Sequence, residues 1–261
     1  MFQPVLPMSG YAGWRFLERT LDVQQETFAR APSVSKITDQ FRADISKVKT
    51  ADDLVENRAL LSVALGAFGL DDDIGNKFFI GKILSDGTTS DTALANRLAD
   101  KSYAAMSAAF GFGDPGGPFT NLTGFADRII AKFEAKQFQR AVGDQDNDLR
   151  LALSIKEGLN DIADQSERPA TQWFSLMGNP PLRAVFETAL GLPSSLAKID
   201  LDQQLRAFQT RSESVFGTNR LSDFKNKTEQ ENLIQMFLIR SQVNAASSRS
   251  SGSIALSLLQ N

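Results

Sequence analysis

Apolar residues recur at helical spacing along most of this chain. The clearest run consists of Val34, Ile37, Phe41, Ile45 and Val48. This spacing places the apolar side chains on one face of an α-helix. Alternation between apolar and polar residues never extends beyond a few positions, so no sheet of consequence is expected. With glycine and proline separating the helical segments, the sequence predicts an all-α helical bundle of about ten helices.

One ten-residue pattern occurs twice, as NRALLSVALG at 57–66 and LRAVFETALG at 182–191. The repetition suggests two similar halves that arose by internal duplication. Each copy ends in an Ala-Leu pair followed by Gly66 or Gly191. We expect the two glycines to be structural equivalents, at which a left-handed residue lets the chain leave its helix. For Gly66, a point of close helix contact is the alternative.

Arg58 and Arg183 occupy the same position in the two copies. A contact with an anion would be the functional interpretation. We favour a repeated salt bridge, or a cap on the carbonyl end of a neighbouring helix. Trp14 and Trp173 each lie on an apolar stripe, which indicates core anchors rather than ligand platforms.

Glycine and proline are concentrated in the segment GFGDPGGP, which cannot continue a helix. We predict a first helical half at 1–112, a linker at 113–118, a second half at 119–246 and a flexible tail at 247–261. A phosphate-binding loop is the alternative for the glycine-rich segment, but no strand precedes it and no Gly-Lys-Ser/Thr follows.

Histidine and cysteine are both absent. Their absence removes the commonest general base, any thiolate nucleophile and the usual zinc ligands. We therefore expect a protein that is not an enzyme and holds no cofactor or metal. A carboxylate-dependent enzyme is a remote alternative. The net charge of −3 argues against a dedicated nucleic-acid binder. No apolar run is long enough to span a membrane.

Two acidic runs resemble metal-binding loops only in part. Asp144-Gln145-Asp146-Asn147-Asp148 matches three ligand positions of a calcium loop, but the required glycine is Leu149 and the final glutamate is Ile155. An acidic first turn of a helix explains the run, because the positive end of the helix dipole favours carboxylates. The triplet at 71–73 fails the same comparison.

Five motifs distributed over the chain resemble one bacterial family. They are Gly10-Tyr11-Ala12-Gly13-Trp14, Phe68-Gly69-Leu70, Ala95-Asn96-Arg97-Leu98-Ala99-Asp100, Phe110-Gly111-Phe112-Gly113 and Ala189-Leu190-Gly191-Leu192-Pro193. The chain is similar to the domain of unknown function numbered twelve-seventeen, which occurs mostly in alphaproteobacteria. Its members are often encoded beside flagellar basal-body genes, and the family has no assigned catalytic residue.

The resemblance implies a structural or accessory component associated with the bacterial flagellum. A cytosolic helical adaptor or chaperone for flagellar assembly is the alternative. Protein partners are expected in either case, and the oligomeric state is left open. The N-terminal residues 1–13 carry no charged side chain and no long apolar run, so they do not read as a secretory signal. The protein is expected in the cytoplasm, or exported to the flagellum without a cleaved signal.

The tail combines a serine-rich segment at 247–253 with an apolar end. Ile254, Leu256, Leu258 and Leu259 make up that end. Serine and glycine predict a flexible spacer, and an apolar cluster is unlikely to stay in water unpartnered. We expect these four residues either to fold back onto the core or to dock into a groove on another subunit or partner.

Overall fold

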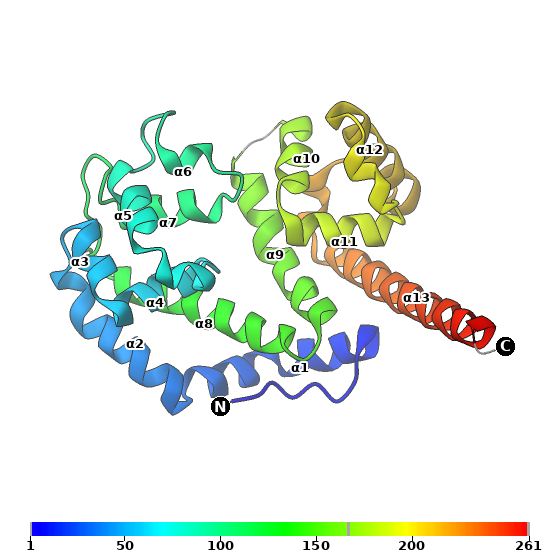
Figure 1. Ribbon diagram of the computed structural model, residues 1–261, viewed down its shortest axis with the longest axis horizontal. Coiled ribbons are helices and arrows are strands. Elements are labelled where there is room, and N and C mark those ends of the chain that lie inside the picture. The colour runs from blue at the N-terminus through cyan, green and yellow to red at the C-terminus, as the bar shows by residue number, and fades with distance from the viewer. Residues whose placement is uncertain (1, 166–167, 260–261) are drawn as a thin grey trace. The chain divides into compact units, whose positions relative to one another are not determined.

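The computed structural model of the protein describes residues 2–165 and 168–259, with side chains described within 2–162 and 168–247. Over the described residues the chain forms thirteen α-helices, four short 3-10 helices and no strand (Figure 1). The predicted all-α class is confirmed. Two of the helices are only six and four residues long, which is too short for an apolar period to reveal them.

The helices divide between two compact units. Unit 1 comprises Met1–Val5 and Thr20–Ala141, and unit 2 comprises Leu6–Arg19 and Val142–Asn261. Each unit contains one copy of the repeated pattern. The glycine-rich segment at 113–118, predicted as a linker, lies within unit 1.

Unit 1 is built around the first motif helix, α4. Its elements are the later part of α1 (Gly10–Ala29), α2 (Pro32–Asp44), η1 (Ile45–Lys47), α3 (Ala51–Glu56), α4 (Arg58–Ala67), η2 (Asp71–Gly75), α5 (Lys77–Asp86), α6 (Leu94–Arg97), α7 (Ser102–Phe110) and most of α8 (Phe125–Gly143). Helix α4 packs against α2, α3 and η2. The largest buried side chains of the unit are Phe41, Ile45, Leu54, Phe110, Phe125 and Phe138.

Unit 2 is built around the second motif helix, α11. It contains the first part of α1, then α9 (Asn147–Gln165), α10 (Pro169–Met177), α11 (Pro180–Leu190), η3 (Ser194–Lys198), α12 (Leu201–Phe216), η4 (Leu221–Lys225) and α13 (Lys227–Leu259). Helix α11 contacts α9, α10, α12 and α13. Both motif helices are therefore central to the packing of their own units.

The core of unit 2 is rich in aromatic rings. Trp173 is fully buried, and its ring lies edge-on to Phe186, whose centroid is 5.8 Å away. The indole N–H of Trp173 donates to the carbonyl of Asn219 at 2.8 Å, so its polar atom is satisfied inside the core. Trp14 is buried as well, and the prediction that both tryptophans are core anchors is confirmed.

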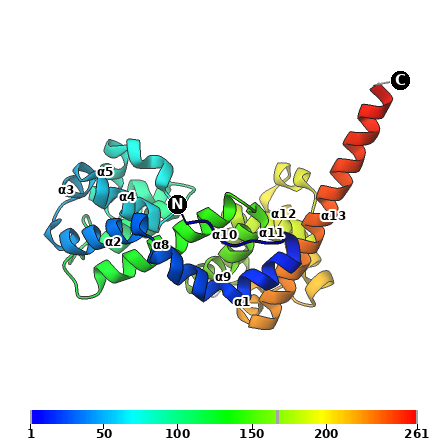
Figure 2. The same ribbon diagram turned by 90° about the horizontal axis from the view of Figure 1, so that it is seen from below.

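Helix α13 is the longest element of the fold, with 33 residues. Its first half is buried within unit 2 through Leu233, Ile234, Phe237 and Leu238. Its second half runs away from the other helices of the unit (Figure 2). From Gln242 to Ser247 every residue is exposed. The helix also continues through the serine-rich segment that was predicted to be a flexible spacer, because extending an existing helix costs far less than starting one.

Candidate interaction surface

Gly191 ends helix α11 in the left-handed conformation, with φ of 65°. Its N–H donates to the carbonyl of Thr188 at 3.0 Å, and the N–H of Leu192 donates to that of Glu187 at 2.8 Å. These two bonds form a Schellman motif, which satisfies the last carbonyls of the helix. The sequence-based expectation for Gly191 is therefore met.

Gly66 is not the equivalent of Gly191, and that prediction is wrong. It lies inside α4 and is not among the glycines with positive φ. A Cβ at Gly66 would lie 2.8 Å from ring carbons of Phe133, so this glycine allows α8 to pack closely against α4. The Schellman motif of α4 forms one turn later, at Gly69, where φ is 72° and the N–H of Leu70 donates to the carbonyl of Leu65.

Arg183 binds three groups in unit 2. Its guanidinium donates to Glu187 at 2.7 Å and to the amide oxygen of Gln204 at 2.8 Å. It also reaches the carbonyl of Met177, the last residue of α10, at 3.5 Å. The expected salt bridge and carbonyl contact are therefore present in the second copy. Arg58, in contrast, is exposed and forms no ion pair with any described residue, so the salt bridge is not repeated.

The acidic run at 144–148 caps helix α9. One carboxylate oxygen of Asp146 accepts the N–H groups of Asp148 and Leu149, each at 3.0 Å. Asp148 accepts a hydrogen bond from the hydroxyl of Ser241 on α13. Two of the three aspartates are thus engaged in structural bonds. Among the described residues, no three Asp or Glu side chains converge as a cation site.

The glycine-rich segment at 111–118 is anchored through one carboxylate. Asp114 accepts four hydrogen bonds of 2.6 to 3.0 Å, from the N–H and hydroxyl groups of Thr88 and Thr89. Partial burial of Asp114 raises its pKa, but the four donors outweigh burial, and the net shift is downward. Gly113 lies against the backbone of Ser85 and Gly87, where a Cβ would clash. The segment is therefore an anchored loop of unit 1.

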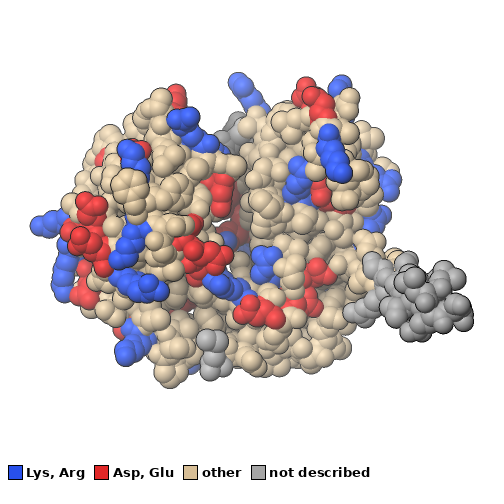
Figure 3. Space-filling view, viewed as in Figure 1, with Lys and Arg blue, Asp and Glu red and all other residues tan. Residues whose placement is uncertain are grey.

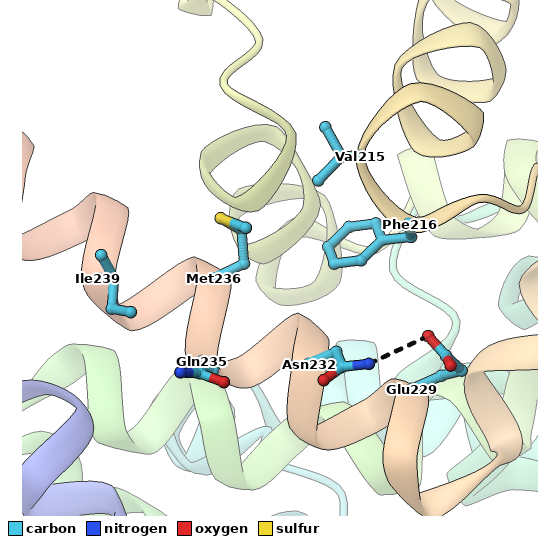
Figure 4. Close-up of a pocket in the computed structure, with 7 residues that line it drawn as sticks. All are labelled: Val215, Phe216, Glu229, Asn232, Gln235, Met236 and Ile239. Atoms are coloured by element: carbon cyan, nitrogen blue, oxygen red, sulfur yellow. Dashed lines mark hydrogen bonds between the residues drawn. The ribbon is translucent and has the colours of Figure 1, made fainter.

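A groove of about 360 Å³ lies between the end of α12 and the first half of α13. Its apolar lining consists of Val215 and Phe216 from α12 and Met236 and Ile239 from α13 (Figure 4). Glu229, Asn232 and Gln235 complete it. Ile239 is 42% exposed, and Val243, one turn further on, is 58% exposed. Exposed aliphatic side chains at successive turns are typical of a helix face that contacts another protein.

This groove was not predicted from the sequence. The apolar face expected for α13 was the buried one, and the spacing of Met236, Ile239 and Val243 went unnoticed, although these residues also recur at three and four positions. The expected contact residues Ile254, Leu256, Leu258 and Leu259 lie on the same helix. Their side chains fall outside the described part of the chain, so their role stays a prediction.

Charged side chains of both signs share the face of the molecule shown in Figure 3. Glu134 in unit 1 has a raised pKa because it is partly buried, an effect that nearby Arg42 opposes. None of the described helices has both the length and the apolar character needed to cross a membrane.

Comparisons with known proteins identify one family and one related fold. The model of the family described as "Protein of unknown function (DUF1217)" matches residues 67–229. A protein from Agrobacterium tumefaciens, solved by X-ray crystallography as a structural genomics target, superimposes with a TM-score of 0.74 and 25% sequence identity. The match covers 94% of this chain and 98% of that one. The search of curated proteins found no match.

Proposed function

This chain belongs to the DUF1217 family of proteins of unknown function, as its motifs predicted, and we propose that it is a non-enzymatic helical protein that acts through contacts with other proteins. One observation carries the proposal. All described residues of α13 from Gln242 to Ser247 are exposed, and an apolar groove lies beside the first half of this helix. A projecting helix with aliphatic residues at successive turns suits recognition of a helical partner.

The cellular setting that we propose is the bacterial flagellum, where the protein would serve as a structural or accessory component. This part rests on the resemblance to a family whose members are often encoded beside basal-body genes. A cytosolic adaptor or chaperone for flagellar assembly is the second candidate. The groove supports this second candidate, because a chaperone needs an exposed apolar surface to bind a segment of another protein transiently.

Cell fractionation separates the two candidates. A tagged copy is expressed in the native host, and the protein is quantified in cytosol, purified basal bodies and culture medium. A structural or accessory component is expected to be enriched in basal bodies or medium, whereas an adaptor or chaperone is expected in the cytosol. The variant Ile239→Glu tests the role of the groove, because it places a charge in the apolar lining. Its matched control is Ile199→Glu. Both isoleucines lie in unit 2 and are 42% exposed, but only Ile239 lines the groove. Equal distribution of the two variants would contradict a role for the groove.

A further inference from the structure

The apolar tail and one wall of the groove belong to the same helix, α13. Groove residues 229–239 and tail residues 254–259 all belong to α13, which is continuous from Lys227 to Leu259. About fifteen residues separate Ile239 from Ile254, which corresponds to roughly 22 Å along the axis at 1.5 Å per residue. The tail would reach its own groove only if the helix broke and reversed. The groove of each chain is therefore out of reach of its own tail.

The two surfaces also match in chemistry. The segment 248–259 contains four large aliphatic residues and a single charged residue, Arg249. The groove is lined by Val215, Phe216, Met236 and Ile239, and its single charged residue is Glu229. Glu229 forms no ion pair among the described residues and is bonded only to Asn232, at 3.5 Å. The segment 248–259 thus supplies aliphatic side chains and one positive charge, and the groove supplies an apolar lining and one negative charge.

A projecting helix also needs a partner for its own stability. Every described residue from Gln242 to Ser247 is exposed, so tertiary packing buries little of this stretch of α13. Helical segments of this length are marginal in water without an apolar face to bury. Contact with a second surface would supply that burial.

We propose that the segment 248–259 of one copy occupies the α12–α13 groove of a second copy, and that the exchange is reciprocal. The occupant is thus this chain's own tail, presented from another molecule. Reciprocal exchange makes the contact two-fold symmetric, so it closes as a dimer. The proposal rests on the proposed function, because it names the partner of the contact helix α13.

The test uses the full chain and three variants, compared by sedimentation velocity over a range of concentrations. One variant ends at Ser247, the second carries Ile239→Glu, and the third carries the control Ile199→Glu. The full chain and the control are expected to dimerise. The tail-less chain and Ile239→Glu are each expected to associate at least about tenfold more weakly, because they remove the aliphatic occupant or place a charge in its site. Far-ultraviolet circular dichroism and cooperative melting verify that each variant is folded.

A mixing experiment distinguishes exchange from a general loss of association. The tail-less chain retains an intact groove, and Ile239→Glu retains an intact tail, so an equimolar mixture is expected to form a heterodimer through one of the two contacts. A full chain that stays monomeric, a tail-less chain that still dimerises, or an Ile239→Glu variant that dimerises normally would each overturn the proposal. A monomeric chain that still co-purifies with basal bodies would remove the self-association and leave the proposed function standing.

Discussion

At the scale of single residues, backbone conformation decides what each glycine contributes to stability. Gly191 is required for its left-handed φ of 65°, whereas Gly66 is required for its missing side chain, because Phe133 packs against it. The identical Ala-Leu-Gly sequence carries both roles. The sequence could not separate them, since the difference lies in a contact with α8.

Asparagine substitutions separate the two roles experimentally. Asparagine tolerates the left-handed conformation better than branched residues, so Gly191→Asn is expected to destabilise less than Gly191→Val, which costs on the order of 1–2 kcal/mol. Gly66→Ala is expected to lower the stability of the fold by about 1–3 kcal/mol through overpacking against Phe133. Gly66→Asn is expected to lower it by at least as much. Urea denaturation measures all four. A Gly66→Asn variant more stable than Gly66→Ala would contradict the helical assignment of Gly66.

Asp114 provides a pH-dependent test in unit 1. The pKa of Asp114 in the folded chain lies below the usual value of about 3.9. Its contribution to the free energy of unfolding is therefore complete above the usual pKa, and it is lost as the pH falls through the lower pKa of the folded chain. Asp114→Asn is expected to lower stability by about 1–2 kcal/mol at pH 7. The difference from the unmodified chain should shrink below about pH 4. Melting temperatures between pH 3 and pH 8 check this, and a difference that grows toward acid would refute the assignment.

At the scale of elements, the two motif helices are offset by about one turn. Helix α11 begins at Pro180 and ends at Leu190, where left-handed Gly191 follows, and Pro193 disfavours helical conformation at Leu192. In the first copy Ala67 and Phe68 follow Gly66, so α4 continues to the next glycine, Gly69. The existence and type of both helices could be predicted from apolar spacing. The offset could have been found only by weighing the residues after the repeat.

The cap of helix α9 gives the prediction at this scale. Asp146 satisfies two backbone N–H groups, and its replacement by alanine is expected to cost about 1 kcal/mol. The same loss is expected with and without calcium, because the acidic run lacks the glycine and glutamate of a calcium loop. Thermal denaturation in both conditions measures the loss. Micromolar calcium binding that Asp146→Ala abolishes would show that the run is a metal site.

At the scale of the whole molecule, the sequence predicted the helical class and the family, but not the surface that we propose as functional. The groove requires the end of α12 to lie near the first half of α13, and no local sequence pattern reveals that proximity. The loop at 113–118 was predicted as a linker from its glycine and proline residues. What the composition does not show is that Asp114 binds back to Thr88 and Thr89.

The central claim is that the second half of α13 is stabilised by contact with another copy of the chain. Amide hydrogen exchange of residues 242–259, followed by mass spectrometry at low and high protein concentration, tests it most directly. We expect rapid exchange of these amides in dilute solution and protection that increases with protein concentration. Ile239→Glu is expected to abolish this increase in protection, and Ile199→Glu is expected to leave it unchanged. Protection that is the same at every concentration would contradict the account.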